Sequence, residues 1–210
     1  IYPLRGKLLN VRNASIAMIA NNKEIKDMIH ALGLRYDVDY TKEENYSKLN
    51  YGTVIILTDS DVDGIHISAL IMNLFHALFP TLLERKKPFI VGMQTPIVKV
   101  SIAGKQKLFY REEDYHVFYN EHKHEKMKTK YYKGLGTSSN KEIKETFGKK
   151  MIPFKKDDET DKMMNKVFDN SRTDDRKKWL SGYKEGFTGG ERNTFTGYLE
   201  RKRRSRATKA

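Results

Sequence analysis

Apolar residues follow a helical pattern in one long segment and a strand pattern in the segment before it. From Gly64 to Glu84 the chain is apolar on nearly every side, which predicts a helix packed on a sheet and broken near Pro80. Residues 53–57 form a short run rich in β-branched side chains, which predicts a buried strand of a parallel sheet. A strand, a turn and a helix therefore follow one another.

A second helix is expected near the N-terminus. Ser15 is a helix-capping residue type and Gly33 a helix-ending one, and apolar residues recur between them at helical spacing. These features predict one helix from Ser15 to about Leu32. The residues from 35 to 52 are polar and resemble turns.

The middle of the chain alternates between short strand and helix patterns. Strands are expected at 88–91, 96–100, 107–111 and 128–133, and short helices at 113–120 and 140–147. The order of strand, acidic turn, helix and strand is typical of an α/β fold. Lys, Asp and Glu dominate residues 149–178, and a basic tail over 191–210 is expected to be disordered.

The composition narrows the class of protein. The 210 residues carry a net charge of +13, so a polyanion such as nucleic acid is the first candidate partner, and a generally adhesive basic protein is the alternative. The absence of cysteine excludes disulfides and thiolate chemistry. No stretch is apolar enough to span a bilayer, so no membrane association is expected. Because the chain starts at Ile1 within a motif-like segment, we expect a fragment of something longer.

Three carboxylates stand on alternate positions where the predicted strand ends: Asp59, Asp61 and Asp63. Crowded carboxylates that stay ionised together require a cation, and their hard oxygens suit Mg²⁺ or Ca²⁺. An EF-hand calcium loop would match these three positions and Gly64, but its twelfth position should be Glu and is Leu70.

Two further interpretations of the acidic turn stay open. It could be a solvated turn that caps the following helix, where each carboxylate contributes about 0.3–1 kcal/mol, and Asp63 could do only this. It could instead be a catalytic Mg²⁺ site, since open α/β sheets bind ligands at the carboxyl ends of their strands. The basic surroundings favour the second interpretation, with a nucleic-acid backbone as substrate.

Two glycine-containing segments have the composition of phosphate-binding loops. Arg5, Gly6 and Lys7 place two cations around a glycine, and residues 133–138, Lys-Gly-Leu-Gly-Thr-Ser, precede a predicted helix. Each could equally be an ordinary turn beside a solvated lysine. His66 could face a substrate, or it could be a satisfied histidine near the start of a helix.

Four of these segments resemble those of one family, the eukaryotic and viral type IIA DNA topoisomerases. The segments are PLRGKLLNVRNAS, TDSDVDGIHI, TPIVKV and YYKGLGTSSNKE, in the order of that family, and TDDRKKWL is similar to one of its helices. The resemblance covers roughly residues 1–185. It implies a TOPRIM fold, a Rossmann-like parallel sheet with flanking helices, plus a mixed α/β extension.

The resemblance also implies domain boundaries. Residues 1–100 would be the C-terminal part of the TOPRIM metal-binding domain. Residues 101–190 would be an extension toward a winged-helix domain that this chain lacks, and the basic tail would follow.

The resemblance assigns roles to individual residues. Asp59 and Asp61 match the Mg²⁺ ligands of the family, and Asp63 matches its third acidic position. Residues that match loops lining the cleaved DNA are Arg5, Gly6, Lys7, Asn10, His66, Lys133, Gly134, Leu135, Gly136, Thr137 and Ser138.

Two parts of the family's catalytic machinery have no counterpart in this sequence. The nucleophilic Tyr and the third metal ligand, a Glu, are not in this chain, and neither is the ATPase domain that binds ATP. The chain alone is therefore not expected to relax DNA.

The resemblance further implies double-stranded DNA and the rest of a homodimeric topoisomerase as partners, and a nuclear or viral-factory location. The alternative function is a non-catalytic basic DNA-binding module on the same fold. A TOPRIM nuclease or primase is a third option, but the two glycine segments disfavour it.

Overall fold

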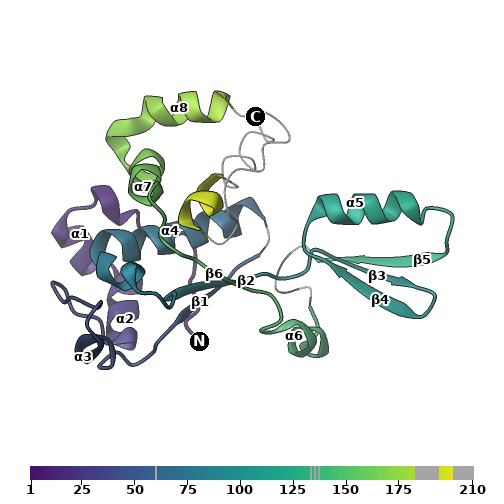
Figure 1. The fold of residues 1–210 in the computed structure, drawn as a ribbon, viewed down its shortest axis with the longest axis horizontal. Coiled ribbons are helices and arrows are strands. Elements are labelled where there is room, and N and C mark those ends of the chain that lie inside the picture. The colour runs from purple at the N-terminus through teal and green to yellow at the C-terminus, as the bar shows by residue number, and fades with distance from the viewer. Residues whose placement is uncertain (60, 133, 135, 137, 183–193, 201–210) are drawn as a thin grey trace. The chain divides into compact units, whose positions relative to one another are not determined.

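The computed structural model describes residues 1–59, 61–132, 134, 136, 138–182 and 194–200. The chain divides into two compact units (Figure 1). The first unit comprises Ile1–Ile56, His66–Gly92 and Ile152–Ala210, and the second comprises Leu57–Ile65 and Met93–Met151. No helix among the described residues has the length and apolar character needed to cross a membrane.

The first unit is built on a sheet with strand order β1-β2-β6. Its strands are β1 (Val54–Leu57), β2 (Ile90–Met93) and β6 (Met151–Pro153). Its helical elements, in chain order, are η1 (Val11–Asn13), α1 (Ile16–Asn21), α2 (Lys23–Leu32), α3 (Glu43–Tyr46), α4 (Val62–Leu78), η2 (Pro80–Glu84), α7 (Thr160–Phe168), η4 (Asn170–Arg172) and α8 (Thr173–Ser181). Neighbouring strands β1 and β2 are joined through α4, as the pattern of the sequence predicts.

Helix α4 is the centre of the first core. Residues from Ala69 to Phe75 are buried almost without exception, so this helix contacts protein on nearly every side. Phe75 packs edge-on against Phe89 at 5.5 Å between ring centroids, which joins the helix to the sheet. The helix ends at Leu78, shortly before Pro80, as predicted.

The single helix expected between Ser15 and Leu32 is two helices. Asn22 ends α1 and begins α2, and its side chain accepts a hydrogen bond from the Ile25 amide at 2.9 Å. Asparagine competes with helical hydrogen bonding and favours caps, which explains the interruption. Gly33 ends α2 in a left-handed conformation, with φ of 71°, as expected of that residue.

Strand β1 is less buried than its apolar sequence suggests. Only Ile56 is buried, whereas Ile55 is 47% exposed and Leu57 is 39% exposed. Side chains alternate between the two faces of a strand, so the described residues cover one face of β1 and leave the other open.

The second unit contains a sheet with order β4-β3-β5, formed by β3 (Val98–Ile102), β4 (Lys105–Phe109) and β5 (Met127–Tyr131). Both pairings are antiparallel, so this sheet differs from the parallel arrangement expected of the first. Helices α5 (Glu112–Glu121) and α6 (Asn140–Thr146) complete the unit. Its core lies between the sheet and α5 and contains Val98, Val100, Phe109, Tyr115 and Phe118.

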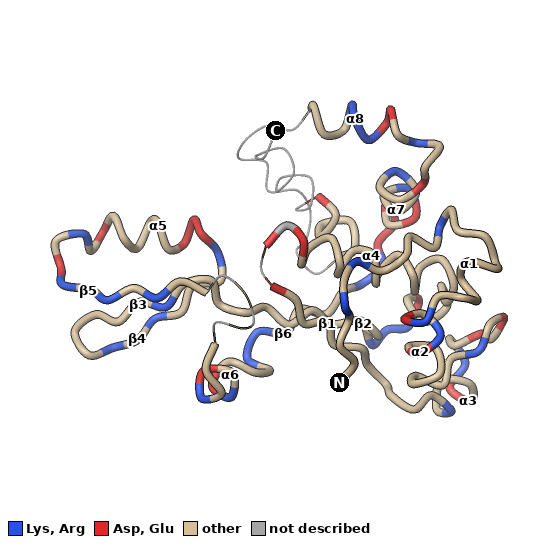
Figure 2. Tube along the Cα trace, turned by 180° about the vertical axis from the view of Figure 1, so that it is seen from behind, with Lys and Arg blue, Asp and Glu red and all other residues tan. Residues whose placement is uncertain are grey.

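Charge separates by element in the second unit. The three strands carry five lysines and no acidic residue, whereas α5 begins with Glu112, Glu113 and Asp114 (Figure 2). Lys107 places its ammonium 4.2 Å from the centre of the Phe118 ring of α5. The apolar stem of such a lysine can cover the core while its charge stays in water.

Two segments of the C-terminal part of the chain form regular structure. The charged stretch 149–178 contains β6, α7 and the start of α8, and α7 buries Met163, Met164, Val167 and Phe168. In the tail expected to be disordered, residues 195–200 are helical and bury Phe195 and Leu199 completely. That expectation fails for 194–200, because two apolar residues four positions apart supply a buried helical face. Residues 191–193 and 201–210 lie outside the described residues.

The hairpin between β3 and β4 has a two-residue turn in which Ala103 adopts a φ of 45° and Gly104 a φ of 74°. Positive φ is unfavourable for alanine, and Asn-Gly is the preferred pair for such a turn.

We expect Ala103→Asn to raise the free energy of unfolding by about 0.5–1 kcal/mol. Denaturant unfolding of the chain measures this change. Ala103→Val should destabilise the same turn, and equal stability of both variants would contradict the assignment.

Candidate functional site

The acidic turn lies between the end of β1 and the start of α4, within the second unit. Asp61 caps α4: its Oδ1 accepts a hydrogen bond from the Gly64 amide at 2.8 Å, and its carbonyl accepts from the Ile65 amide. The capping role considered for Asp63 therefore belongs to Asp61. Asp63 lies in the first turn of α4, where a carboxylate interacts favourably with the helix dipole.

Gly64 is required by the close approach of the Asp59 backbone. A Cβ atom at position 64 would lie 2.0 Å from the Asp59 carbonyl oxygen, a distance that no side chain can adopt. The glycine thus lets the chain reverse directly from the strand end into α4, which keeps the acidic residues at the end of the strand. The close approach of the Asp59 carbonyl oxygen therefore explains why position 64 is glycine.

Gly134 lies against the Asp59 carboxylate. A Cβ at position 134 would stand 3.1 Å from Asp59 Oδ2 and 3.4 Å from Cγ, so the backbone at Gly134 packs close to this side chain. Both residues belong to the second unit. The structure therefore brings together one predicted metal ligand and one predicted phosphate-binding glycine, which are 75 positions apart in the sequence.

The donor chemistry of this turn fits Mg²⁺ in part. Carboxylate oxygens are the hard ligands that this ion prefers, and Asp61 uses only one of its oxygens for the cap. Within the described ranges, no three Asp, Glu or His side chains gather as a complete metal site requires. The residues present supply ligands of the right kind but do not by themselves form a full set.

The glycine segment leads into α6 through a capping box. The Ser139 side chain accepts a hydrogen bond from the Glu142 amide, and the Glu142 side chain accepts from the Ser139 amide. Gly134, Gly136 and Ser138 precede this cap and are described, whereas Lys133, Leu135 and Thr137 lie outside the described residues.

The basic segment of the first unit is exposed. Arg5, Gly6 and Lys7 all lie at the surface, and Gly6 adopts a φ of 152° with no atom near the position of a Cβ. An open, flexible glycine between two cations is compatible with close approach of a phosphate to the backbone. His66 also belongs to the first unit, on α4, and is half-buried.

Asn10, which the family resemblance assigns to the loops that line DNA, makes hydrogen bonds within the first unit. Its side-chain amide donates to the Phe168 carbonyl at 2.8 Å and accepts from Asn73 at 2.9 Å. Both ends of the amide are thus used within the first unit, where they join the basic segment to α4 and α7. Through these bonds Asn10 links the N-terminal segment to Asn73 of α4 and Phe168 of α7.

Arg12 is a functional candidate that the sequence did not reveal. Its guanidinium donates to Asn73 at 3.1 Å and to His76 Nδ1 at 2.7 Å, and it also bonds Asn165. Because Arg12 can only donate, His76 Nδ1 accepts and Nε2 donates to Asp161, at 2.7 Å. These partners are 61 to 153 positions away from Arg12, so no local sequence signal could have identified the network.

The protonation of this network is set by burial. Burial lowers the pKa of His76, and the Arg12 charge lowers it further, against the opposing effect of the Asp161 hydrogen bond. The His76 ring is therefore neutral near pH 7. The network fixes the first residues of the chain against α4 and α7 through hydrogen bonds that a neutral histidine alone can make.

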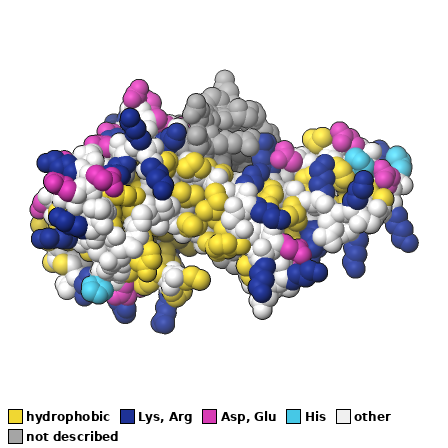
Figure 3. All heavy atoms as spheres, turned by 60° about the horizontal axis from the view of Figure 1, so that its bottom comes forward, with side chains coloured by type: hydrophobic (Ala, Val, Ile, Leu, Met, Phe, Trp, Pro, Cys, Tyr) yellow, Lys and Arg dark blue, Asp and Glu magenta, His cyan; other side chains and the backbone are white. Residues whose placement is uncertain are grey.

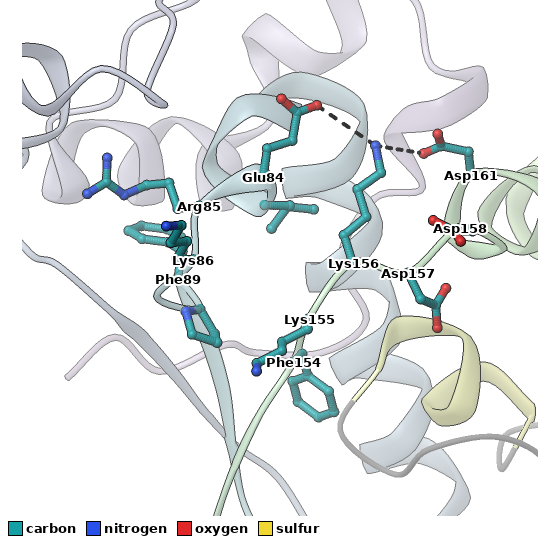
Figure 4. A pocket seen from close by; sticks show the side chains of 12 residues that line it. Glu84, Arg85, Lys86, Phe89, Phe154, Lys155, Lys156, Asp157, Asp158 and Asp161 are labelled. Atoms are coloured by element: carbon teal, nitrogen blue, oxygen red, sulfur yellow. Dashed lines mark ion pairs between the residues drawn. The ribbon is translucent and has the colours of Figure 1, made fainter.

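A separate cavity of about 850 Å³ lies beside Lys156 in the first unit (Figure 4). Lys156 reaches Asp161 at 3.3 Å and Glu84 at 3.9 Å, so its charge is balanced by two carboxylates. None of the predicted site residues lines this cavity. Both acidic and basic side chains line the cavity, so it has little selectivity for an anion.

Comparisons with known families place both parts of the chain. A family model described as the Toprim domain matches residues 1–92, and one described as the C-terminal associated domain of TOPRIM matches residues 93–204. The match thus extends beyond residue 185, where the resemblance of the motifs fades.

Named relatives are DNA topoisomerases. DNA topoisomerase 2 of Invertebrate iridescent virus 6 is 41% identical over 194 residues, which is 87% of this chain and 17% of the relative. Human DNA topoisomerase 2-alpha is 41% identical over 190 residues, or 88% of this chain and 12% of the relative. The chain therefore spans between 12% and 17% of the length of these relatives.

A solved structure has the same fold. The crystal structure of the Plasmodium falciparum topoisomerase II DNA-binding, cleavage and re-ligation domain aligns with a TM-score of 0.85 and 31% identity. The alignment covers 99% of this chain and 29% of that chain. The predicted TOPRIM fold with a mixed α/β extension is confirmed.

Replacing Gly64 tests the steric cause of the turn. Gly64→Ala should lower the free energy of unfolding by about 2 kcal/mol, because the new methyl group overlaps the Asp59 carbonyl. Gly136→Ala is the control, since nothing lies within 4 Å of its Cβ position. Denaturant titration of both variants measures the difference, and equal stabilities would contradict the close approach.

The neutral His76 ring makes stability depend on pH. Its folded-state pKa is below the ordinary 6.5, so the unfolded chain binds the proton more readily. The stabilisation is complete above about pH 6.5 and is lost as the pH falls below that value. We expect the melting temperature to fall over this range, and to fall less in His76→Gln.

The exposed His30 on α2 provides the matched control for that experiment. His30→Gln should follow the wild-type dependence of melting temperature on pH. A His76→Gln curve as steep as the wild-type curve would show that the Arg12 network does not carry the effect.

Proposed function

The chain belongs to the type II DNA topoisomerase family, and on that basis we propose that it is the Mg²⁺-binding Toprim portion of an ATP-dependent enzyme that cleaves, passes and religates double-stranded DNA. The proximity of Gly134 to the Asp59 carboxylate, where a Cβ built on the glycine would stand 3.1 Å from Oδ2, carries this proposal. An acidic group thus lies near a glycine of the segment that we propose binds phosphate. A centre that acts on phosphodiester bonds needs both a cation site and an anion site.

The three acidic residues would bind the ion in different ways. Asp59 and Asp61 would hold Mg²⁺ at the end of β1, and Asp63 would act through water or through the helix dipole. When bound, the ion stabilises negative charge on the scissile phosphate and on the leaving 3′ oxygen. A third carboxylate ligand and the nucleophilic tyrosine would come from parts of the enzyme outside this sequence.

Basic and glycine residues would bind the DNA backbone. Lysine and arginine side chains project from the face of the molecule that Figure 3 shows, in keeping with the net charge of +13. Arg5 and Lys7 would contribute ionic phosphate contacts, while Gly134, Gly136 and Ser138 would contribute backbone amides and a hydroxyl. The proposed contacts also include Lys133, Leu135, Thr137 and His66. Asn10 would position the basic segment through its bonds to Asn73 and Phe168.

The remaining partners follow from the proposed enzyme. ATP would bind to a separate domain, the enzyme would act as a homodimer, and its place of action would be the nucleus or a viral replication site. These proposals rest on family membership together with the motifs of the sequence, and they concern the whole enzyme.

One observation favours a second candidate function. The described residues do not gather three metal-binding side chains, which is also what a non-catalytic, basic DNA-binding module on this fold would show. Such a module would bind DNA through charge alone, with a strong dependence on salt. The two candidates differ in whether Asp59 matters for chemistry.

Asp59→Asn in the full-length enzyme separates the two candidates. The amide keeps the shape of the side chain but loses its charge, so DNA cleavage should fall by about 100-fold or more while DNA affinity changes little. Cleavage-complex formation on plasmid DNA and filter binding measure the two quantities.

Asp158→Asn is the control, because Asp158 is exposed and lies outside the acidic turn. It should cleave as the wild type does. Undiminished cleavage by Asp59→Asn would exclude the enzymatic proposal and leave the DNA-binding module.

A further inference from the structure

Glu142, in the first turn of α6, accepts hydrogen bonds from more groups than a capping box needs. Oε1 accepts from Tyr132 at 2.7 Å, from Lys130 at 3.0 Å and from Lys99 at 3.3 Å. Oε2 accepts from Lys130 at 2.8 Å and from the amide and hydroxyl of Ser139 at 2.9 and 3.0 Å. The side chain is only 13% exposed, so these bonds largely replace water.

The donors come from both ends of the glycine segment. Tyr132 directly precedes Lys133, and Ser139 directly follows Ser138. One carboxylate therefore joins the residue before the segment to the residue after it. Joining the two ends of a loop lowers the conformational entropy of the chain between them.

The two lysines anchor this carboxylate to the sheet. Lys99 and Lys130 are directly opposite each other in the pairing of β3 with β5, so their side chains share one face of the sheet. A capping box alone would require only Ser139. The additional bonds fix α6 and the glycine segment to two strands, which is a positioning function beyond that of ending a helix.

The electrostatics of the cluster agree with its geometry. The Lys130 hydrogen bond, together with those from Ser139 and Tyr132, holds the pKa of Glu142 well below its ordinary value. Burial and the same carboxylate raise the pKa of Tyr132. Glu142 is thus ionised and Tyr132 protonated throughout the neutral range, and their hydrogen bond persists.

The residues that Glu142 bonds lie on both sides of Gly134 in the chain, and Gly134 lies near Asp59. A Cβ built on Gly134 would stand 3.1 Å from Asp59 Oδ2. All of these residues belong to the second unit. Glu142 therefore bonds Tyr132 and Ser139, and between these two residues in the chain Gly134 lies near the proposed metal ligand.

We propose that Glu142 is a positioning residue for the cleavage reaction, which sets the distance between the Gly134 backbone and the Asp59 carboxylate. This inference rests on the proposed function. Glu142 contacts neither metal nor DNA, and it acts by holding the segment that does. Its loss should therefore change how readily the acidic turn takes up Mg²⁺, while DNA affinity, which depends on many cations, stays nearly constant.

Glu142→Gln in the full-length enzyme tests the proposal, with Glu145→Gln as the matched control. Glu145 lies on the same helix, is exposed, and would lose the same charge. Glu142→Gln should slow cleavage at low Mg²⁺ by about 10-fold and raise the half-saturating Mg²⁺ concentration by a similar factor. Glu145→Gln should match the wild type in both measurements.

A second variant decides the matter if Glu142→Gln fails to fold, as judged by loss of its melting transition. Tyr132→Phe removes one hydrogen bond to the carboxylate and leaves the cap and both lysines, so the half-saturating Mg²⁺ concentration should rise by up to about 5-fold. In that case an unchanged Mg²⁺ requirement in Tyr132→Phe overturns the proposal.

Two results with folded Glu142→Gln would also overturn it: wild-type cleavage at every Mg²⁺ concentration, or weaker DNA binding at an unaltered Mg²⁺ requirement. Asp59→Asn, assayed in parallel, separates failure of the proposed role of Glu142 from failure of the proposed function. If Asp59→Asn abolishes cleavage and Glu142→Gln does not alter it, only the role of Glu142 fails. If Asp59→Asn has no effect, the proposed function fails.

Discussion

The close approach between Gly64 and the Asp59 carbonyl oxygen is the constraint on which the site depends. It leaves no room for a side chain at position 64, and it allows α4 to begin at Val62, directly after the capping residue Asp61. Because the helix starts so early, Asp59, Asp61 and Asp63 stay at the end of β1. The same helix then continues into the core of the first unit, where its residues are almost fully buried. A local steric requirement thus connects the acidic turn directly to the buried helix α4.

Two partly buried polar clusters each join segments that are distant in the sequence. In the second unit, the Glu142 carboxylate collects lysine, tyrosine and serine donors and secures the glycine segment beside Asp59. In the first unit, Arg12 and His76 secure the start of the chain against α4 and α7. Hydrogen bonds in which one partner is ionised are stronger than those between two neutral groups, and they specify geometry as well as energy. The exposed cations that would meet DNA are thereby attached to rigid elements.

Much of the fold could be predicted from local patterns, and the exceptions have physical causes. The apolar run of α4, the strand before it and the acidic turn were recognisable because each uses neighbouring residues. The division of α1 from α2 depends on one capping bond of Asn22, which periodicity could not reveal. The spacing of Phe195 and Leu199 is visible in the sequence, but their burial depends on partners distant in sequence, such as Phe154. Asn10 matches a DNA-lining position of the family, yet its amide is used internally. Glu142 could have been found from the capping-box spacing Ser139-x-x-Glu142, although not its lysine partners.

Replacing Mg²⁺ by Fe²⁺ in the full-length enzyme bound to DNA tests most directly whether the acidic turn and the glycine segment form one metal-dependent centre. Hydroxyl radicals generated at a bound iron cut the nearest backbone, so the fragments locate the metal. If they form one centre, we expect cuts in two places within this chain, around Asp59 to Gly64 and around Gly134, and excess Mg²⁺ should suppress both. Cuts confined to other regions, or cuts at the acidic turn without any near Gly134, would contradict it.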